Sequence, residues 1–586
     1  MGPLRLGDFV GVVRGELIGP ATDIEIEHPA THSSRIHSGA AFFALPGSRA
    51  DGHDFVGSAA RNGAAAAVVK AGRLNEEIRA AGIPIVAVDD PLRALQRLAA
   101  WWRRSLDTRF VAVVGSIGKT VTKDCLVHLL SARRPVYGTP GSYNSQLGVP
   151  LAILGCPRTA ETAVIEVAVS DPGEMGRLAA VVQPDDVVLT NVGTRWRYRF
   201  ADRRAQMREL LQIAADRPLV LGEADAELRA AAEEIASAVQ VVGASPGLPA
   251  FTRRRRDRDA DIAVTFPDGQ TASLVVRTPS VEILDDVELA VSAAWRLGLD
   301  PAAIGEALAD YTPTSTRMEI WPSPSGVTLV RDAATPDPMA VGAAVRAAKR
   351  LERHGGRTVV VLGPPAGTWG AQAAADLAHA LVSERADEVL AVVAGADDRL
   401  VRVTDQLEGR LPVRLFAEMD ELRRHLVDGL GPGDVCLVQS PPGRGIGDLS
   451  SSIAEAMAPT RLYLDLAALE ENVTTFRRLV GPKVRILAMV KALAYGTDPV
   501  AMAQALAHGD DAVALTLDLQ ESGVDCLGVS NADEGVALRR AGVTVPILVM
   551  LGTEAELDKM VRYSLTPLLY SETMVAAVTT LAKDGV

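Results

Sequence analysis

Short apolar runs alternate with longer amphipathic stretches along most of this chain. An apolar run of about four to eight residues is typical of a buried strand, and amphipathic stretches with helical period separate these runs. The alternation predicts parallel sheets covered by helices, with binding sites at the carboxyl ends of the strands. In the first two segments we expect strands at 41–45, 65–69, 83–88, 110–114, 163–167 and 186–190, and helices at 121–131 and 173–181.

The same rhythm continues to the end of the chain. Later strands are expected at 327–330, 358–362, 388–393, 434–438, 461–466, 486–490, 526–529 and 546–550, with helices that begin at Met339 and Ala371. A chain of 586 residues accommodates about four domains of roughly 150 residues each. The pattern therefore predicts an α/β protein with domains at 1–105, 106–315, 316–458 and 459–586.

The apolar run at 110–114 leads directly into Gly115-Ser116-Ile117-Gly118-Lys119-Thr120. A strand and a glycine-rich turn that ends in Lys-Thr are typical of a loop that binds a nucleoside triphosphate. Glycines let backbone N–H groups approach phosphate oxygens, Lys119 brings positive charge to the β- and γ-phosphates, and the Thr120 hydroxyl can reach Mg²⁺. The loop is two residues shorter than the usual form, and the match of the motif alone is therefore weak. The strand before the loop and the helix expected after it favour ATP binding over a plain glycine turn.

Composition and charge exclude some classes of protein. A net charge of -13 argues against general nucleic-acid binding, which depends on neutralising phosphates. The arginine run at 253–256 is followed by three nearby aspartates, and we expect it to be a solvated loop. The four cysteines fit no metal-ligand spacing and indicate buried thiols in a reducing compartment. With no signal sequence and no apolar stretch long enough to span a membrane, a cytoplasmic location is expected.

Motifs in the first three segments resemble those of the Mur ligase family, in the order of its domains. They are Ser34-Arg35, 39–47 and 51–55, then 142–150, Ile165-Glu166 and 190–193, then Arg317-Met318-Glu319, Asp332 and 433–435. The fourth segment resembles the start of an alanine racemase, with Lys491 at the position of the lysine that holds pyridoxal phosphate. The resemblance implies a UDP-binding domain, a central ATPase domain with a parallel sheet and a Rossmann-like C-terminal domain, followed by a partial (β/α) barrel.

This resemblance implies an ATP-dependent amide ligase, similar to those that join a UDP-linked muramoyl tripeptide to D-alanyl-D-alanine. In such ligases a substrate carboxylate attacks the γ-phosphate of ATP, and an amine then displaces phosphate from the acyl phosphate. Lys119 and Glu166 would act in catalysis, and Thr120 and Glu166 would ligate Mg²⁺. The implied ATP contacts are Gly115, Ser116, Gly118, Lys119, Thr120, Asn191, Arg317 and Asp332, and the implied substrate contacts are Ser34, Arg35, Asn144 and Ser145.

Several positions depart from the family pattern, and they gather at the ATP and metal positions. Trp196 stands where the family has a metal-associated histidine, and residues 201–214 contain no lysine, although the family has a carbamylated one. Gln439 replaces a lysine, and the residues after Asp332 are Ala-Ala-Thr. Ile117 takes the place of an asparagine, and Arg195, Arg197 and Arg199 are interpreted either as a clamp that replaces one metal ion or as an exposed basic loop.

The racemase-like segment is shorter than a complete alanine racemase would be. About 125 residues follow Thr460, whereas a complete barrel with its partner domain needs at least roughly 250. The second catalytic base and the later phosphate-binding loops of that family have no counterpart. We therefore expect no racemase activity from this chain as written, weak binding of pyridoxal phosphate at Lys491, and a dimer through this segment as one option.

Two hypotheses stand. The first is a Mur-type ligase that uses ATP and Mg²⁺ to join a UDP-linked or other carboxylate to an amino-acid or dipeptide amine. The second is a catalytically impaired scaffold, or a ligase of a specialised pathway, fused to the racemase segment. Lys119, Thr120 and Glu166 favour the first hypothesis, whereas Trp196, Ala333 and Gln439 favour the second.

Overall fold

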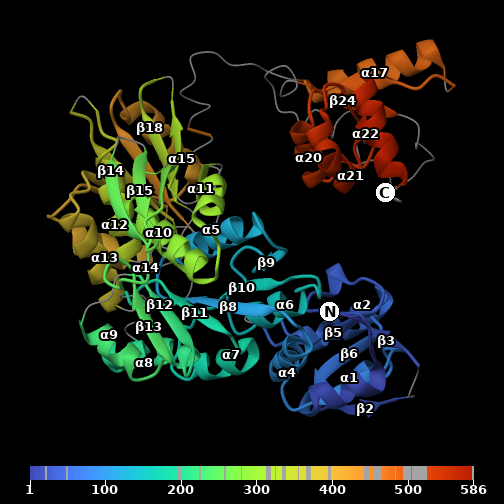
Figure 1. Ribbon diagram of the computed structural model, residues 1–586, viewed down its shortest axis with the longest axis horizontal. Helices are drawn as coiled ribbons and strands as arrows, with labels where there is room; N and C mark the ends of the chain where they lie inside the picture. The colour runs from blue at the N-terminus through green and yellow to red at the C-terminus, as the bar shows by residue number, and fades with distance from the viewer. Residues whose placement is uncertain are drawn as a thin grey trace. The chain divides into compact units, whose positions relative to one another are not determined.

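The computed structural model divides the chain into two compact units, Met1–Pro459 and Thr460–Val586, and each is described by itself (Figure 1). Residues 461–464 of the strand expected at 461–466 lie outside the described residues, and the expectation is wrong at its end, where Asp465 caps a helix that begins at Leu466. The described residues are 1–19, 23–47, 50–193, 199–222, 226–255, 259–276, 278, 280–309, 311, 318–323, 325–332, 338–353, 355–363, 371–392, 398–440, 449, 452–453, 465–481, 483–491, 503 and 524–583.

The N-terminal part of the first unit is a mainly parallel sheet. Its strands lie in the order β2 (Glu16–Ile18), β7 (Ile85–Val88), β6 (Ala66–Lys70), β5 (Ala40–Phe43) and β4 (His28–Ala30), with β2 antiparallel to β7. The strands expected at 41–45, 65–69 and 83–88 are confirmed. Around the sheet lie β1 (Leu4–Arg5), β3 (Glu25–Ile26), α1 (Leu6–Val13), α2 (Val56–Arg61), α3 (Glu76–Arg79) and α4 (Pro91–Arg104).

The central sheet is parallel throughout. Its order is β13 (Ala238–Val241), β12 (Pro218–Leu221), β11 (Asp186–Leu189), β8 (Arg109–Val114), β10 (Thr162–Glu166) and β9 (Val136–Gly138). The chain leaves β8 toward β10 and β9 and later returns to β11 on the other side of β8. A reversal of strand order of this kind opens a crevice at the carboxyl ends, where ligands of α/β proteins bind.

Helices cover both faces of the central sheet (Figure 1). On one face α5 (Lys119–Ser131) and α10 (Val281–Arg296) bury Val111 and Val113, and on the other face Phe110 and Val114 pack in a second core. The helices expected at 121–131 and 173–181 are confirmed as α5 and α7 (Glu174–Val182). The remaining helices are α6 (Gly148–Leu154), α8 (Arg203–Leu211), α9 (Ala226–Glu233) and α11 (Pro301–Ala309).

A three-stranded antiparallel sheet interrupts the α/β pattern, and the sequence interpretation missed it. It consists of β14 (Ala250–Arg255), β15 (Ala260–Thr265) and β16 (Thr271–Val276). The expectation of a solvated arginine loop at 253–256 is wrong for Arg253, which lies within β14. Its guanidinium pairs with Asp285 and Glu288 of α10, and these two carboxylates offset the cost of burying its charge.

The C-terminal part of the first unit has a second six-stranded sheet. Its order is β17 (Glu319–Pro322), β18 (Thr328–Asp332), β22 (Val435–Gln439), β19 (Thr358–Leu362), β20 (Glu388–Val392) and β21 (Val413–Phe416), and only β17 is antiparallel to its neighbour. The expected strands of this segment are confirmed. Its helices are α12 (Pro338–Lys349), α13 (Ala371–Ser383), α14 (Asp398–Leu407) and α15 (Met419–Gly429), and α12 shares an apolar core with α5 and α10.

The second unit contains four parallel strands in sequence order, β23 (Leu487–Met489), β24 (Cys526–Val529), β25 (Ile547–Val549) and β26 (Thr566–Pro567). Its helices are α17 (Leu466–Val480), α20 (Ala532–Arg540), α21 (Leu557–Arg562) and α22 (Glu572–Lys583). The strands expected at 486–490, 526–529 and 546–550 are confirmed, whereas the partial barrel stays a prediction. In the described part of the chain, no helix combines the length and apolar character that a membrane crossing needs.

Candidate active site

The loop between β8 and α5 depends on two glycines. Gly115 has φ +134° and Gly118 has φ +84°, a backbone region that favours glycine. A Cβ atom on Gly115 would lie 2.2 Å from the hydroxyl oxygen of Thr190, and one on Gly118 would lie 2.0 Å from Oδ1 of Asp286. Backbone conformation and close neighbours therefore both exclude larger residues at these two positions.

The residues that follow β11 hold this loop in place through hydrogen bonds. Thr190 Oγ1 and Asn191 Nδ2 donate hydrogen bonds to the Ile117 carbonyl at 2.5 and 3.0 Å, and Ile117 N donates to Asn191 Oδ1 at 3.3 Å. Ser116 N donates to the Asn191 carbonyl at 3.0 Å, and Gly193 N donates to Ser116 Oγ at 2.9 Å. Asn191 therefore shapes the loop, and its predicted contact with ATP stays a prediction.

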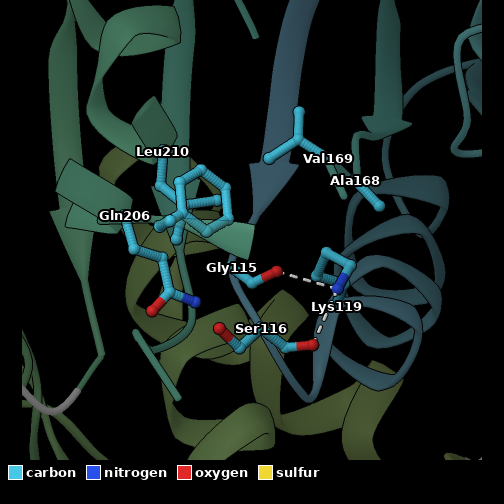
Figure 2. Close-up of a pocket in the computed structure, with 8 residues that line it drawn as sticks. Gly115, Ser116, Lys119, Ala168, Val169, Gln206 and Leu210 are labelled. Atoms are coloured by element: carbon cyan, nitrogen blue, oxygen red, sulfur yellow. Dashed lines mark hydrogen bonds between the residues drawn. The ribbon is translucent and has the colours of Figure 1, made fainter. Parts of the chain in front are cut away.

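The side chain of Lys119 folds over the loop (Figure 2). Its Nζ donates hydrogen bonds to the carbonyls of Gly115 at 2.8 Å and Ser116 at 2.9 Å, and the residue is only 6% exposed. These contacts hold an ammonium group at the loop, where a nucleotide's β- and γ-phosphates bind in proteins of this kind.

Thr120 and Glu166 meet at the carboxyl ends of two adjacent strands. Thr120 Oγ1 donates to Glu166 Oε2 at 3.0 Å, and Asn144 Nδ2 donates to Glu166 Oε1 at 2.6 Å. Glu166 is the last residue of β10 and is 1% exposed. A hydroxyl and a carboxylate beside a phosphate-binding loop fit one Mg²⁺ ion, which takes oxygen ligands from one or two carboxylates, phosphates and waters. Ser145 is placed nearby, where its hydroxyl accepts a hydrogen bond from Gly148 N at 3.1 Å.

The residues that the structure describes do not offer a second pair of ligands like Thr120 and Glu166 to another metal ion. No group of three or more His, Cys, Asp or Glu side chains is arranged there to hold a metal ion. The pocket beside the loop has no carboxylate in its described lining (Figure 2). That lining consists of Gly115, Ser116, Lys119, Ala168, Val169, Phe200, Gln206 and Leu210.

Asp286 is a buried carboxyl group that the sequence interpretation missed. It belongs to α10, is 7% exposed, and accepts a hydrogen bond from Thr122 Oγ1 at 3.3 Å. Burial raises the pKa of Asp286 well above its usual range, and the charge of Asp285 adds to the shift. The only signal in the sequence is a carboxylate at a helix position whose neighbours at 283, 284 and 287 are apolar.

The other predicted site residues lie at several places. Ser34 and Arg35 belong to a 3-10 helix, Ser33–Arg35, between β4 and β5. Asp332 ends β18 and pairs in register with Gln439 of β22. Lys491 follows β23 and is exposed. Arg317, Arg195, Trp196, Arg197 and 333–335 lie outside the described residues, and Arg199 pairs with Asp171 at 2.6 Å.

Gln439 is an unusual buried residue of the C-terminal sheet. It ends the strand between β18 and β19, is fully buried, and has no hydrogen-bond partner for either side-chain amide atom in the structure described. A buried amide without partners costs about 1–3 kcal/mol. With no partner among the described residues, the side chain of Gln439 is expected to lower the stability of the fold.

Family comparisons follow this architecture along the chain. The Mur ligase family catalytic domain matches residues 25–103, the Mur ligase middle domain matches 113–244, and the Mur ligase glutamate ligase domain matches 316–441. Together these matches cover more than half of the 586 residues. The chain belongs to the Mur ligase family. Beyond the three Mur ligase domains, the alanine racemase N-terminal domain matches 464–518 and 507–585.

Individual relatives of this Mur ligase agree with the family match. The UDP-N-acetylmuramoyl-tripeptide–D-alanyl-D-alanine ligase of Bacillus subtilis is 27% identical over 365 residues, which cover 60% of this chain and 76% of that protein. The enzyme of the same name from Mycobacterium tuberculosis is 29% identical over 354 residues, 53% of this chain and 66% of that one.

Solved structures show the same fold at lower identity. MurF from Acinetobacter baumannii has a TM-score of 0.66 at 23% identity and covers 78% of this chain and 99% of its own. MurF ligase from Thermotoga maritima, solved in complex with ADP, has a TM-score of 0.61 at 23% identity and covers 73% of this chain and 97% of its own.

Proposed function

We propose that this chain is an ATP-dependent amide ligase that joins a UDP-linked muramoyl tripeptide to D-alanyl-D-alanine. The observation that carries the proposal is the contact of Thr120 with Glu166 at the carboxyl ends of β8 and β10, beside a loop that presents Lys119. Both substrates are those in the names of the relatives from Bacillus subtilis and Mycobacterium tuberculosis.

Each residue has a defined part in this proposal. The N–H groups of Ser116 and Ile117 donate to Asn191, so in this proposal the backbone N–H groups at the N-terminal end of α5 bind phosphate oxygens. Lys119 stabilises the charge that accumulates on the γ-phosphate. Thr120 and Glu166 would hold Mg²⁺, which supplies further positive charge to the phosphates when bound. Asn144 orients Glu166 through the hydrogen bond to Oε1. The attacking carboxylate forms a bond to the γ-phosphorus as ADP leaves, and the amine then forms the amide as phosphate leaves.

The remaining assignments belong to the same proposal. Ser34 and Arg35 contact the UDP part of the carboxylate substrate from the first domain, and Asn144 and Ser145 contact its far end. Arg317 and Asp332 contact the adenosine part of ATP from the third domain. The domain boundaries near residues 105 and 315 separate these three sets of contacts, and the boundary near 458 follows the third set.

The test is a phosphate-release assay with both substrates, followed by mass spectrometry of the product. We expect phosphate only when ATP, the UDP-linked tripeptide and D-alanyl-D-alanine are all present, and a product that contains both peptides. Lys119→Ala should lower the rate at least tenfold, or about 1.4 kcal/mol. Lys559→Ala, on the second unit, is the matched control and should leave the rate unchanged. Phosphate release without amide product would contradict the proposal.

A second candidate function is a scaffold that retains the ligase fold and carries the racemase-like unit. Gln439 stands in place of a family lysine and has no side-chain partner among the described residues, and this departure inside the C-terminal domain favours the scaffold. Pyridoxal phosphate binding stays a prediction of weak affinity, since the exposed Lys491 is not enclosed by the described residues. Dimer formation through this unit also stays a prediction. Nucleotide binding without any turnover would support the scaffold.

A further inference from the structure

Helix α5 contains a second buried lysine, to which the proposed reaction gives no part. Lys123 lies one helical turn after Lys119 and is 3% exposed. Its Nζ donates hydrogen bonds to the carbonyl oxygens of Thr139 at 2.9 Å and Gly141 at 3.1 Å, and forms an ion pair with Asp124 at 2.6 Å. Burying an ammonium group costs free energy unless its N–H groups and its charge are paired. The partners of Lys123 therefore show which part of the chain this charge holds in place.

Both carbonyl groups belong to the segment 139–144, which follows β9 and leads to the proposed metal site. Thr139, at the start of this segment, is 2% exposed. Its hydroxyl accepts a hydrogen bond from Glu166 N at 2.9 Å and donates one to the Val164 carbonyl at 3.4 Å. Lys123 thus holds the carbonyl group of the residue whose hydroxyl holds the backbone of Glu166.

The other end of the segment reaches the side chain of Glu166. Asn144 Nδ2 donates to Oε1 of Glu166 at 2.6 Å, and the Asn144 carbonyl accepts a hydrogen bond from Ala168 N at 2.9 Å. Between the two ends the chain turns at Gly141, which has φ +51°, in the backbone region that favours glycine. Lys123 therefore holds the segment at its start and at its turn, and the segment contacts both the backbone and the carboxylate of Glu166.

We propose that Lys123 is a positioning residue for Glu166, the proposed carboxylate ligand of Mg²⁺. It acts through the segment 139–144, and this inference rests on the proposed ATP-dependent function. Helix α5 also carries Thr120, the other proposed ligand. Lys123 therefore connects the helix that carries one ligand to the segment that orients the other. Groups that orient a metal ligand typically change metal affinity by about 10–100-fold when they are removed.

The experiment measures phosphate release by the full chain as the concentration of free Mg²⁺ is varied, with ATP, the UDP-linked tripeptide and D-alanyl-D-alanine at saturation. Lys123→Met removes the ammonium group and keeps an unbranched side chain. We expect the Mg²⁺ concentration for half-maximal release to rise about tenfold, because Glu166 is no longer held in the orientation that binds the ion. A merely structural defect would lower the maximal rate, through the amount of active protein, and would leave this concentration unchanged.

Two further variants test the route from Lys123 to Glu166. Thr139→Val removes the hydroxyl that accepts from Glu166 N and keeps the shape of the side chain, so it should raise the same Mg²⁺ concentration at least about threefold. This variant decides the question if Lys123→Met does not fold. In the double variant Lys123→Met/Asn144→Ala, the rise should equal that of the larger single variant, because both residues act through one segment.

Lys349→Met is the matched control, since Lys349 lies in the last turn of α12 and forms ion pairs with Glu352 and Asp387. It should keep the Mg²⁺ requirement of the wild type although its ion pairs are lost. An unchanged Mg²⁺ requirement in Lys123→Met and Thr139→Val, or effects that multiply in the double variant, would overturn the inference and leave the ligase function standing. Absence of phosphate release by the wild type with both substrates would overturn the proposed function itself.

Discussion

The hydroxyl of Thr120 donates a hydrogen bond to Oε2 of Glu166 at 3.0 Å and so joins the first turn of α5 to the end of β10. The contact spans 46 residues of sequence and depends on the parallel pairing of β8 with β10, in which Glu166 lies beside Val113. The contact places a hydroxyl and a carboxylate side by side. The proposed Mg²⁺ site therefore depends on the register in which β8 and β10 pair.

Glu166→Gln tests the charge of this pair. The amide oxygen still accepts the hydrogen bond from Thr120, but the negative charge that attracts Mg²⁺ is lost. We expect the Mg²⁺ concentration for half-maximal phosphate release to rise at least about tenfold, or 1.4 kcal/mol. Glu161→Gln, an exposed position just before the same strand, is the control and should not change it. An unchanged Mg²⁺ requirement in Glu166→Gln would remove Glu166 from the metal site.

Gly118→Ala tests the fit of the loop against α10. The added Cβ meets a positive φ and also lies 2.0 Å from Oδ1 of Asp286. Gly298→Ala is the matched control, because Gly298 has nearly the same φ, +86°, with no atom within 4 Å of the added Cβ. Urea unfolding should show a loss of about 1–2 kcal/mol in Gly298→Ala from backbone strain alone and a larger loss in Gly118→Ala. Equal losses of unfolding free energy in the two variants would mean that the Asp286 carboxyl group moves away from the added Cβ at no cost.

Asp286→Asn tests the buried carboxyl group. Burial raises the pKa of Asp286 well above its usual range, helped by Asp285 and opposed by the hydrogen bond from Thr122. Above the usual pKa, the unfolded chain releases this proton while the folded chain retains it. Rising pH therefore favours unfolding, and the stability that the protonated group contributes is lost as the pH approaches its folded-state pKa. Asparagine has no such proton.

We expect the unfolding free energy of Asp286→Asn to exceed that of the wild type at neutral pH, with the difference shrinking toward about pH 4. Denaturant unfolding at several pH values between these limits measures it. Glu306→Gln, at a largely exposed side chain, is the control and should show a much smaller dependence. A difference that grows as the pH falls would mean that Asp286 is ionised in the folded chain.

Gln439→Leu tests whether the buried amide is a functional residue. Removing two unpartnered polar atoms from a fully buried position should raise the unfolding free energy by about 1–3 kcal/mol, because leucine has a similar volume. If Gln439 contacts a substrate, the same variant should also be slower in phosphate release, a trade of stability against activity. A lower unfolding free energy in Gln439→Leu would mean that the amide of Gln439 does have a hydrogen-bond partner in the folded chain.

Much of the fold follows from local patterns, because parallel strands buried on both faces are continuous apolar runs. The runs at 163–167 and 358–362 matched β10 and β19 for this reason. The sheet β14–β16 was missed because one of its strands carries the arginine run, and only the carboxylates of α10, about 30 residues later, show that Arg253 is inside the fold.

The site was predictable only where the chemistry is local. The loop from Gly115 to Thr120 is contiguous in sequence, so its spacing revealed it. Gln206 carries no local signal, and the only local signal of Asp286 is a carboxylate among apolar helix positions. Both residues reach the site through the approach of α8 and α10 to the loop. Glu166 was found through the family resemblance, and its distance to Thr120 depends on strand register, which spacing does not reveal.

The most direct test of the ligase function uses a UDP-linked tripeptide whose terminal carboxylate is labelled with ¹⁸O. If that carboxylate attacks the γ-phosphate, one labelled oxygen passes to the phosphate when the amine displaces it. We predict that phosphate released in the presence of D-alanyl-D-alanine contains one ¹⁸O atom per molecule and that one amide forms for each phosphate. Unlabelled phosphate would show that water, and not the substrate, attacks ATP, and would contradict the account.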